Sequence, residues 1–338
     1  MAHYLTAELE LQMGKEASDA WGTAVAPSVQ LQGITSASIR PIVEGRPIEE
    51  IRGTLFPAYQ SIIAKKGAEA SVSGLVLYED VAFWLDSMFE IPSTDNGKLT
   101  TDATYPVRTY NAPEHSTDMT DTRSNTLVYG DVTNVWGMTG GVVNTLTVSG
   151  GTGEPLTFTA DLIGKTVASD TLDSDTSDSD RTVTICMGDH AVLSIDLDSD
   201  AVGTTPVSDC AYSFELVLNA NRAPLHHMGD QTPGTYRNAP WSGTLNLLLE
   251  FNSTVAGYVD AIVDATTIPI GKNVRLKFSS GSHYIQIDFG GKFMEAPELF
   301  EDTDGVISTN LVLVGEQTSG MTTAWCIITV KTNVETLP

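Results

Sequence analysis

Short segments rich in β-branched, aromatic and other apolar residues recur along most of this chain, with glycine, proline, asparagine and aspartate between them. Roughly a dozen strands of this length, separated by turn residues, indicate an antiparallel β-sandwich or β-barrel. No internal repeat of fixed period is visible. The segments that carry the pattern are 36–44, 69–77, 125–135, 144–149, 156–160, 182–186, 191–197, 213–218, 243–251, 273–278, 284–289, 306–314 and 324–331.

One segment, 78–89, has the spacing of a helix instead of a strand. Its apolar residues recur three and four positions apart, which places them on one helical face. We interpret this face as core packing and not as a partner-binding surface. A second helix is predicted over 253–265, with Asn252 or Ser253 as its N-cap. The residues of the first helical face are Leu77, Val81, Trp84, Leu85 and Met88.

Acidic residues greatly outnumber basic ones. The 338 residues include 43 Asp and Glu against 18 Lys and Arg, which gives a formal net charge of −25. Such a chain should repel nucleic acid and anionic membranes, so a general attraction to either is excluded. Hydrophobic residues make up 41% of the chain, enough for a buried core. The N-terminus does not have the pattern of a secretory signal, and no apolar stretch approaches the length of a transmembrane helix.

The charge is densest between 170 and 200, where nine Asp occur with a single Arg. We expect the stretch of about 168–205 to be an exposed acidic insertion. Within it, Asp196, Asp198 and Asp200 occupy the first, third and fifth positions of a calcium-binding loop. The glycine required at the sixth position and the glutamate at the twelfth are absent, so these three residues are weak calcium candidates.

No combination of residues predicts catalysis or a cofactor site. Residues 164–166 (GKT) resemble the end of a phosphate-binding loop, but the earlier glycine is missing. His226 and His227 are adjacent and would point to opposite faces of a strand. The cysteines show no CxxC spacing and are interpreted as free thiols, with one disulfide as the alternative that the sequence leaves open. They are Cys186, Cys210 and Cys326.

The order of the elements resembles a known family. A short arm ending in GTAVAPS precedes a strand pair, the helix YEDVAFWLDSMFEIP and the polar stretch TYPVRTYNAPEH. The strands in NTLVYGDVTNVWGMTGGVVNTLTVSGGTGEPLTFTADLIGKTVA follow, and the chain closes with IQIDFGGKFMEAPELFEDTDGVISTNLVLVGEQ and AWCIITVKTNV. Over about residues 15–333 this order resembles the major tail tube proteins of long-tailed bacteriophages with non-contractile tails.

The resemblance implies a tail-tube β-sandwich with one flanking amphipathic helix over 34–333, an N-terminal arm at 1–33 and a C-terminal tail at 334–338. It also implies that six copies close into a ring with an inner β-barrel, and that rings stack into the conduit for DNA ejection. Two tandem tube folds, closing a ring with fewer chains, stay open because the chain is long for one such fold. The implied partners are further copies of the chain, tape measure and tail terminator proteins, and DNA in transit, with no membrane. The implied location is the virion tail, assembled in the host cytoplasm.

Two sequence features acquire a role under this resemblance. Carboxylates that line the bore would let DNA pass without binding, whereas carboxylates on the exterior would only confer solubility. We favour the bore for acidic residues within regular strands. Trp21 lies in the predicted arm, and we expect it to dock on a neighbouring subunit.

Three other functions compete with this interpretation. A carbohydrate- or receptor-binding β-sandwich would show exposed aromatic clusters, but aromatic residues make up only 7% of the chain. The tube of a related injection machine, such as a type VI secretion tube or a gene-transfer particle, is usually much shorter. A hydrolase adapted to high salt would need a nucleophile and a base, and no such combination is present.

Overall fold

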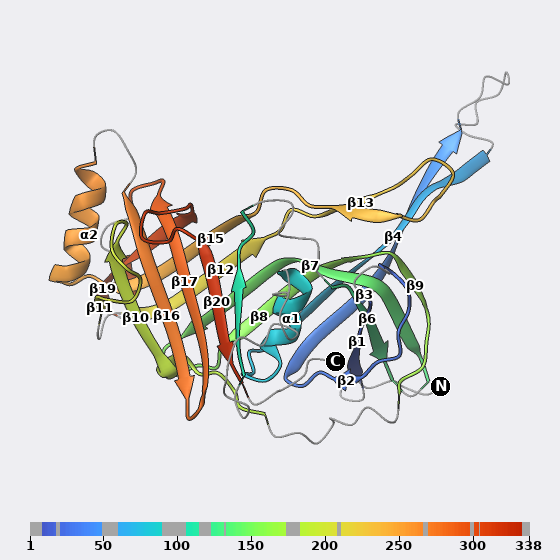
Figure 1. Ribbon diagram of the computed structural model, residues 1–338, viewed down its shortest axis with the longest axis horizontal. Helices are drawn as coiled ribbons and strands as arrows, with labels where there is room; N and C mark the ends of the chain where they lie inside the picture. The colour runs from blue at the N-terminus through green and yellow to red at the C-terminus, as the bar shows by residue number, and fades with distance from the viewer. Residues whose placement is uncertain are drawn as a thin grey trace.

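The computed structural model (Figure 1) describes residues 9–17, 21–48, 60–89, 106–114, 123–131, 133–173, 183–207, 211–265, 270–297, 301–303 and 305–332. Within these residues the protein is mainly antiparallel β, with two α-helices. The predicted fold class, a β-rich sandwich or barrel of the tube type, is confirmed.

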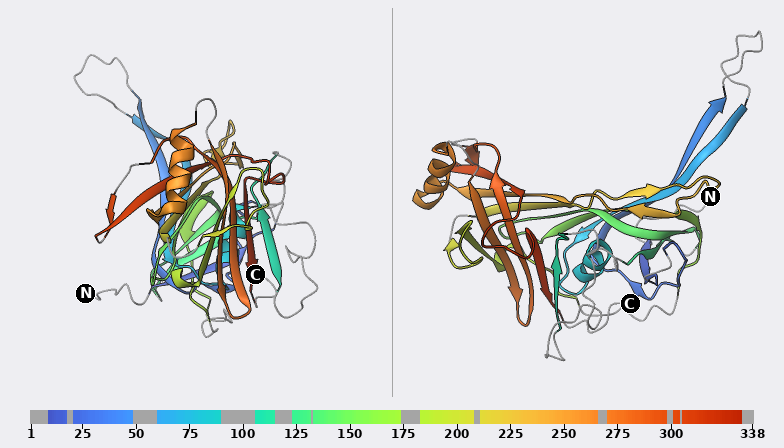
Figure 2. Two further views of the ribbon diagram at one scale, coloured as in Figure 1. Left: turned by 90° about the vertical axis from the view of Figure 1, so that its left-hand side faces the viewer. Right: turned by 45° about the horizontal axis from the view of Figure 1, so that its top comes forward.

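Seven strands form the largest sheet, in the order β3–β4–β8–β7–β12–β15–β19, and every neighbouring pair is antiparallel. The right-hand view of Figure 2 shows its long strands along the top of the body, with most of the remaining elements below them. The strands are β3 (Ile34–Ile48), β4 (Gln60–Leu75), β7 (Val135–Gly151), β8 (Thr157–Gly164), β12 (Ala211–Asn219), β15 (Ser242–Glu250) and β19 (Val306–Gly315).

Two smaller sheets form the second layer. One has the order β2–β1–β6–β7–β9 and the other the order β11–β10–β16–β17–β20–β5. The end of β17 also pairs with β19, as does the short strand β18. The bounds are β1 (Glu10–Lys15), β2 (Val29–Gln30), β5 (Val107–Asn111), β6 (Asn125–Gly130), β9 (Thr166–Ser169), β10 (Ala191–Leu197), β11 (Pro206–Val207), β16 (Gly271–Ser280), β17 (His283–Phe293), β18 (Glu301–Thr303) and β20 (Cys326–Lys331).

The hydrophobic core lies between the large sheet and the second layer. Alternate residues of the large sheet point inward, as the period of two in a β-strand requires. Phe214 of β12 packs on Phe278 of β16 with ring centroids 5.4 Å apart. Trp84 packs on Phe158 of β8 at 5.3 Å. These aromatic pairs fix the two layers against each other.

Each of the two helices directly follows a strand of the large sheet. Helix α1 (Val81–Met88) comes after β4, and α2 (Ser253–Val263) comes after β15. Asn252 caps α2, because its side-chain oxygen accepts hydrogen bonds from the backbone N–H groups of Thr254 and Val255 at 2.9 and 3.0 Å. The helix predicted at this position is therefore confirmed, and of its two candidate N-caps Asn252 is the one that the structure shows.

The strand pairing of the first half of the chain recurs in the second half. In the first half β3 pairs with β4, β4 with β8, β8 with β7, and β7 with both β6 and β9, while β1 pairs with β2 and β6. The second half repeats these pairings in the same chain order. There β12 pairs with β15, β15 with β19, β19 with β17, and β17 with both β16 and β20, while β10 pairs with β11 and β16. The strands β12, β15, β19, β17, β16, β20, β10 and β11 thus correspond in turn to β3, β4, β8, β7, β6, β9, β1 and β2. Helices α1 and α2 occupy the same place in this order.

A pair of glycines marks the same bend in both halves. Gly140–Gly141 lies where β7 leaves β6 and β9 for β8, and Gly290–Gly291 lies where β17 turns to β19. A Cβ on Gly291 would lie 2.8 Å from the carbonyl oxygen of Val314, and one on Gly141 would lie 3.0 Å from that of Asn125. The close approach of backbones at each bend therefore requires glycine.

The structure corrects the expectation of an arm at 1–33. Residues Glu10–Lys15 form β1, which pairs with β6 over its whole length, and Val29–Gln30 form β2. Leu11 and Met13 are buried in the core. Two alternating apolar residues are enough to anchor a short strand when its partner strand is already in place. The expected C-terminal tail, 334–338, lies outside the described residues.

The acidic stretch of about 168–205 is also not one exposed insertion. Its described part includes β9 and β10, and β10 pairs with β16 along its whole length. Asp196, inside β10, is only 1% exposed. Residues 174–182, where the Asp density is highest, lie outside the described residues.

Candidate functional site

The face of the large sheet that points away from the core carries mainly serine, threonine and asparagine. Directly opposed residues in antiparallel strands point to the same side, so the register defines rows across the sheet. We call this surface the polar face. One row is Ser36, Ser73, Thr159, Thr147, Val217, Thr244 and Val314, and the next is Ser38, Ser71, Asp161, Thr145, Asn219 and Ser242.

The charged groups on the polar face are mostly carboxylates. Asp161 accepts a hydrogen bond of 2.6 Å from the hydroxyl of Ser71, and Glu215 accepts one of 2.9 Å from the amide of Asn246. Arg40 is ion-paired with Glu69, the next residue of β4 on this face. The first row continues from Val314 to Lys292 of β17, whose ammonium is ion-paired with Glu316. Apart from these paired cations the surface offers hydroxyls and carboxylates, which do not bind phosphate groups strongly.

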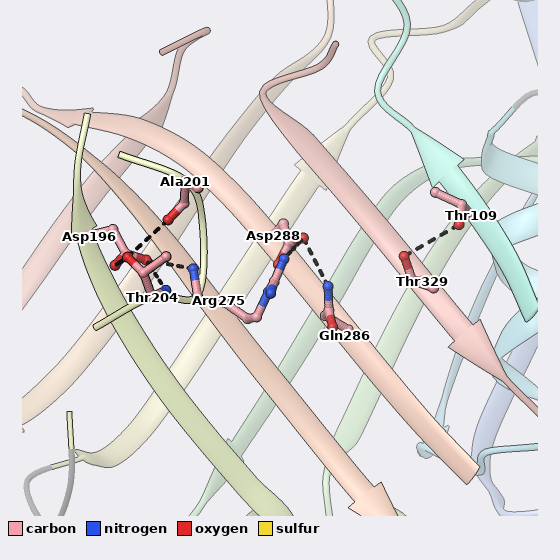
Figure 3. A network of polar contacts seen from close by, with 9 residues as sticks. Thr109, Asp196, Ala201, Thr204, Arg275, Gln286, Asp288 and Thr329 are labelled. Carbon is pink, nitrogen blue, oxygen red and sulfur yellow. Dashed lines mark hydrogen bonds and ion pairs between the residues drawn. The ribbon is translucent and has the colours of Figure 1, made fainter. Parts of the chain in front are cut away.

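The second exposed sheet face holds a denser polar network, drawn in Figure 3. Arg275 of β16 forms a two-pronged ion pair with Asp288 of β17, at 2.6 and 2.8 Å, and Gln286 donates to the same carboxylate at 3.0 Å. Hydrogen bonding to Asp288 raises the pKa of Arg275. The contacts are complementary within the sheet, so they explain rigidity and not ligand binding.

The calcium candidates do not form a cluster. The carboxylate of Asp196 accepts hydrogen bonds from the backbone N–H of Gly203 at 2.6 Å, that of Thr205 at 2.7 Å and the hydroxyl of Thr204 at 2.6 Å. Its oxygens therefore hold the 198–205 turn (Figure 3). Asp198 is hydrogen-bonded to Ser319 and Asp200 is exposed. No group of three or more potential metal-ligating side chains is present in the part of the chain that the structure describes.

Strands β3 and β4 continue beyond the sheet as a projecting two-stranded hairpin (Figures 1 and 2). β4 pairs with β8 only from Ala68 onward, whereas the β3–β4 pairing continues to Ile48 and Gln60. The projecting part exposes large apolar side chains that the body does not cover. They are Ile42, Val43, Ile62 and Ile63, with exposed fractions of 39, 56, 52 and 43%.

A second ribbon braces the base of this hairpin. It consists of β13 (Ala223–Leu225) and β14 (Thr235–Arg237), and the loop between them reaches β4. The carbonyl oxygen of Gln231 accepts a hydrogen bond of 2.8 Å from the backbone N–H of Lys66. The side-chain amide of Gln231 donates to the carbonyl of Ile63, and Nε2 of His226 donates to that of Lys66, both at 3.0 Å. These bonds occupy the edge of β4 that β8 leaves open.

Trp21 packs against its own chain. Its indole Nε1 donates a hydrogen bond of 2.9 Å to the carbonyl of Gly140, and its ring lies 5.6 Å from that of Tyr236 and 5.6 Å from Nζ of Lys165. Glu16 fixes the adjoining turn by accepting from the backbone N–H of Gly22 at 2.7 Å. The indole remains half-buried. The contact with a neighbouring subunit expected from the sequence stays a prediction.

The helical face predicted from the sequence lies mostly inside the core. Leu77, Trp84, Leu85 and Met88 are buried and Val81 is half-buried. The carbonyls of Ser87 and Met88 accept hydrogen bonds from the guanidinium of Arg222, which also donates to the carbonyl of Val143 at 2.7 Å. Burial lowers the pKa of Arg222 to about 10. Arg222 thus joins α1 of the first half to the second half.

The cysteines that the structure describes are free thiols. Cys186 and Cys326 are buried, and burial raises the pKa of both, that of Cys186 to about 12. Cys210 lies outside the described residues. A buried thiol with a raised pKa is a poor nucleophile, so neither of the two described thiols is placed for catalysis.

Sequence reasoning missed the polar face and the apolar hairpin, and of the two only the polar face leaves a signal. Serine or threonine alternates with apolar residues in ASVSGL, TLTVS and TFTAD, and this alternation corresponds to the rows of the polar face. Exposed isoleucines on a long hairpin have no comparable signature, because the same residues in a sheet would be buried.

Comparison with known proteins identifies a family. A family model described as phage tail tube protein matches residues 6–317. No curated protein matches the chain at a significant level. No helix in the described ranges is long and apolar enough to cross a membrane.

Proposed function

Because this chain belongs to the phage tail tube protein family, we propose that its copies close into rings of six tube folds, and that the rings stack into the tube through which DNA is ejected. Membership makes it a structural component of the virion tail that assembles with itself and with other tail components. The proposal of rings that stack into a tube rests on one observation, the seven-stranded sheet with one polar face and one open edge strand.

Ring closure needs a sheet edge that can pair with another subunit. Among the described residues, β3 pairs only with β4, so its other edge is available over the length of the strand. An open edge of this kind promotes uncontrolled aggregation unless it is paired, and closing a ring pairs it. Edge pairing therefore joins neighbouring subunits and, once the ring has closed, leaves no free edge for further growth.

The position of the bulk of the molecule supports one assignment of the face that lines the bore. The two small sheets and α1 cover the inner, apolar face of the large sheet, and the polar face carries no such layer. A sheet that closes around an axis leaves little room on its concave side. The covered face must then point outward, and the polar face must line the bore.

The chemistry of the polar face suits the passage of DNA. Its hydroxyls and the carboxylates of Asp161 and Glu215 do not attract phosphate, and the cations on this face, Arg40 and Lys292, are each ion-paired with a glutamate. A like-charged wall keeps the polymer from adsorbing. The acidic character of the strands thus serves transit, whereas the acidic residues of 174–182 have no described position.

Stacking is assigned to the β3–β4 hairpin. It projects from the body and exposes Ile42, Val43, Ile62 and Ile63. The segment 40–69 has five basic and four acidic residues, in a chain with a net charge of −25. A nearly neutral, apolar hairpin can approach the acidic body of the next ring, which the bodies themselves cannot do without repulsion.

The remaining partners follow from the same assembly. We place the tape measure protein inside the tube and a tail terminator at its end, with assembly in the host cytoplasm before incorporation into the virion. Electron microscopy of the purified protein in negative stain tests the proposal. Stacked rings or tubes are the expected result. A monodisperse monomer at high concentration would overturn it and favour a carbohydrate- or receptor-binding module.

A further inference from the structure

We propose that this chain is two tube folds in tandem, so that three chains close one ring, and that the joint between chains repeats the β7–β12 joint within each chain. The inference rests on the proposed ring assembly and specifies its subunit number and contact. The family resemblance implied six chains in each ring. This inference replaces them with three chains of two folds each.

The first support is the repeated topology. Each half contributes four strands to the large sheet: β3, β4, β8 and β7 from the first, and β12, β15, β19 and the end of β17 with β18 from the second. Each half also supplies its own second layer and its own helix. Seven strand pairings match one for one, which is far more than two unrelated β segments would share.

The second support is the ladder that joins the halves. Strand β12 pairs with β7 over seven residues, from Ser213 opposite Gly151 to Asn219 opposite Thr145. This contact links the last strand of one fold to the first strand of the next, inside one sheet. It is therefore an observed example of how two tube folds lie side by side.

Applying the same contact between chains selects the strands that pair. The strand equivalent to β12 is β3, and each begins four residues after the end of β2 or β11, at Ile34 and Ala211. The segment equivalent to 213–219 is 36–42. Its partner in the neighbouring chain is the end of β17 with β18, which holds the place of β7.

Two prolines limit this ladder on β3. Proline has no N–H, so it is accommodated where the backbone nitrogen faces away from the partner strand. The backbone nitrogens of Pro41 and Pro47 therefore point toward the open edge. The register with β4 is continuous from 36 to 44, so the N–H groups of residues 37, 39 and 43 point in the same direction. Pro41 interrupts this row of outward N–H groups after residues 37 and 39, so the proposed ladder ends there and the hairpin past Pro41 stays free to project.

The size of the barrel also favours three chains. With the end of β17 and β18 counted as an eighth strand, three chains contribute 24 strands, and at ~4.8 Å per strand the barrel is roughly 37 Å across before strand tilt widens it. Six chains would contribute 48 strands and a barrel roughly 73 Å across. The wider ring would hold a DNA duplex only loosely.

Cryo-electron microscopy of tubes assembled from the full chain, together with native mass spectrometry of single rings, tests the inference. The expected result is threefold symmetry with three chains per ring. Six chains per ring would overturn the tandem inference and leave the proposed function standing. A protein that forms no rings at all would overturn both.

A pair of proline variants tests the edge directly. Ala37→Pro removes an outward N–H within the proposed ladder, and Val43→Pro removes one on the same strand beyond it. We expect Ala37→Pro to lower the yield of rings at least tenfold and Val43→Pro to leave ring closure unchanged. Thermal unfolding of the monomers shows whether a lower yield of rings comes from the lost edge hydrogen bond or from misfolding. Equal ring yields from two folded variants would overturn the assignment of the joint.

Discussion

Lys15 and Asp86 form an ion pair inside the protein, with Nζ and Oδ2 3.2 Å apart and only 10 and 6% of their side chains exposed. Tyr110 donates a hydrogen bond of 2.7 Å to the other carboxylate oxygen. The pair ties β1, a strand that the sequence suggested was an arm, to α1. Burial raises the pKa of Asp86 and lowers that of Lys15, so desolvation outweighs pairing for both groups.

We expect Lys15→Met to destabilise the monomer by about 3–5 kcal/mol at neutral pH, because it leaves the carboxylate of Asp86 buried without its cation. A buried acid with a raised pKa is stabilised by protonation, so the loss should shrink as the pH falls. Urea unfolding at several pH values measures this. The control is Lys15→Met combined with Asp86→Leu, which removes both charges and should recover most of the stability. A loss that is independent of pH would contradict the prediction.

The turn held by Asp196 should fail on acidification. Burial alone would raise the pKa of Asp196, but hydrogen bonds from Thr204, Gly203 and Thr205 hold it below its usual value. A carboxyl with a lowered pKa stabilises the fold above its unfolded-state pKa, and that contribution is lost as the pH falls through the folded value. We expect Asp196→Asn to cost about 1–3 kcal/mol at neutral pH and progressively less below about pH 4. The exposed Asp200→Asn is the matched control and should be neutral at every pH.

Lysines on the polar face should make the bore retain DNA. In the double variant Asp161→Lys and Glu215→Lys, each fold of the chain gains a cation on the face assigned to the bore. Tubes assembled with short DNA duplexes should then protect DNA from nuclease at about 50 mM salt and release it at about 200 mM. Asp260→Lys on α2 with Asp264→Lys at its C-cap adds the same charge to exposed residues outside the polar face. If that control protects DNA as well as the test variant does, the polar face is not the bore.

The exposed apolar side chains of the hairpin should be needed for stacking and not for ring closure. Ile42, Glu44 and Arg46 are alternate residues of β3 and therefore point to the same face of the hairpin. Ile62 of β4 lies opposite Arg46, so Ile62 shares that face with Ile42. We expect Ile42→Ser with Ile62→Ser to give intact rings that stack into shorter tubes or none, as seen by electron microscopy. Val192→Ser with Leu197→Ser replaces two residues of β10 that are each 56% exposed, more than Ile42 or Ile62, and should leave tube length unchanged.

Trp21→Ala should weaken assembly more than it weakens the monomer. The monomer loses one hydrogen bond and a half-buried ring, worth about 1–2 kcal/mol in unfolding. Trp21→Phe keeps a ring but not the Nε1 donor, so it separates the two contributions. Unchanged tube length and yield in Trp21→Ala, with a stable monomer, would show that the indole serves only its own chain.

The fold class and both helices could be predicted from the sequence, because periods of two and of about 3.6 residues follow directly from burial on one side of a strand or helix. The segment at 78–89 contains α1 and the segment at 253–265 contains α2. Asn252 could also be predicted, since a side-chain acceptor at an N-cap acts locally.

The repeated topology could not be predicted, because the two halves differ where they carry extra segments. The chain between α1 and β6 runs from Met88 to Asn125 and includes β5, whereas α2 and β16 are separated only by the chain from Val263 to Gly271. In the second half the ribbon β13–β14 lies between β12 and β15 instead. No fixed offset survives these insertions, although the glycine pairs at 140–141 and 290–291 are a local trace of the repeat.

The role of Asp196 was also beyond sequence reasoning. A run of aspartates indicates solvation or metal binding by composition alone. Only the pairing of β10 with β16 places Asp196 beneath the turn whose N–H groups donate hydrogen bonds to its carboxylate. Long-range pairing decided the environment of this residue, and no local pattern records it.

The tandem arrangement has a mechanical consequence for the assembled tail. Within a chain, the seam between the halves combines the β7–β12 ladder, a continuous backbone and the guanidinium of Arg222. The seam that we propose between chains would have only the edge of β3. A ring built from such chains alternates tethered and dissociable seams. When the tail flexes in solution, strain should concentrate along the dissociable seams, so the tube bends and finally splits lengthwise between whole chains and never through the middle of one.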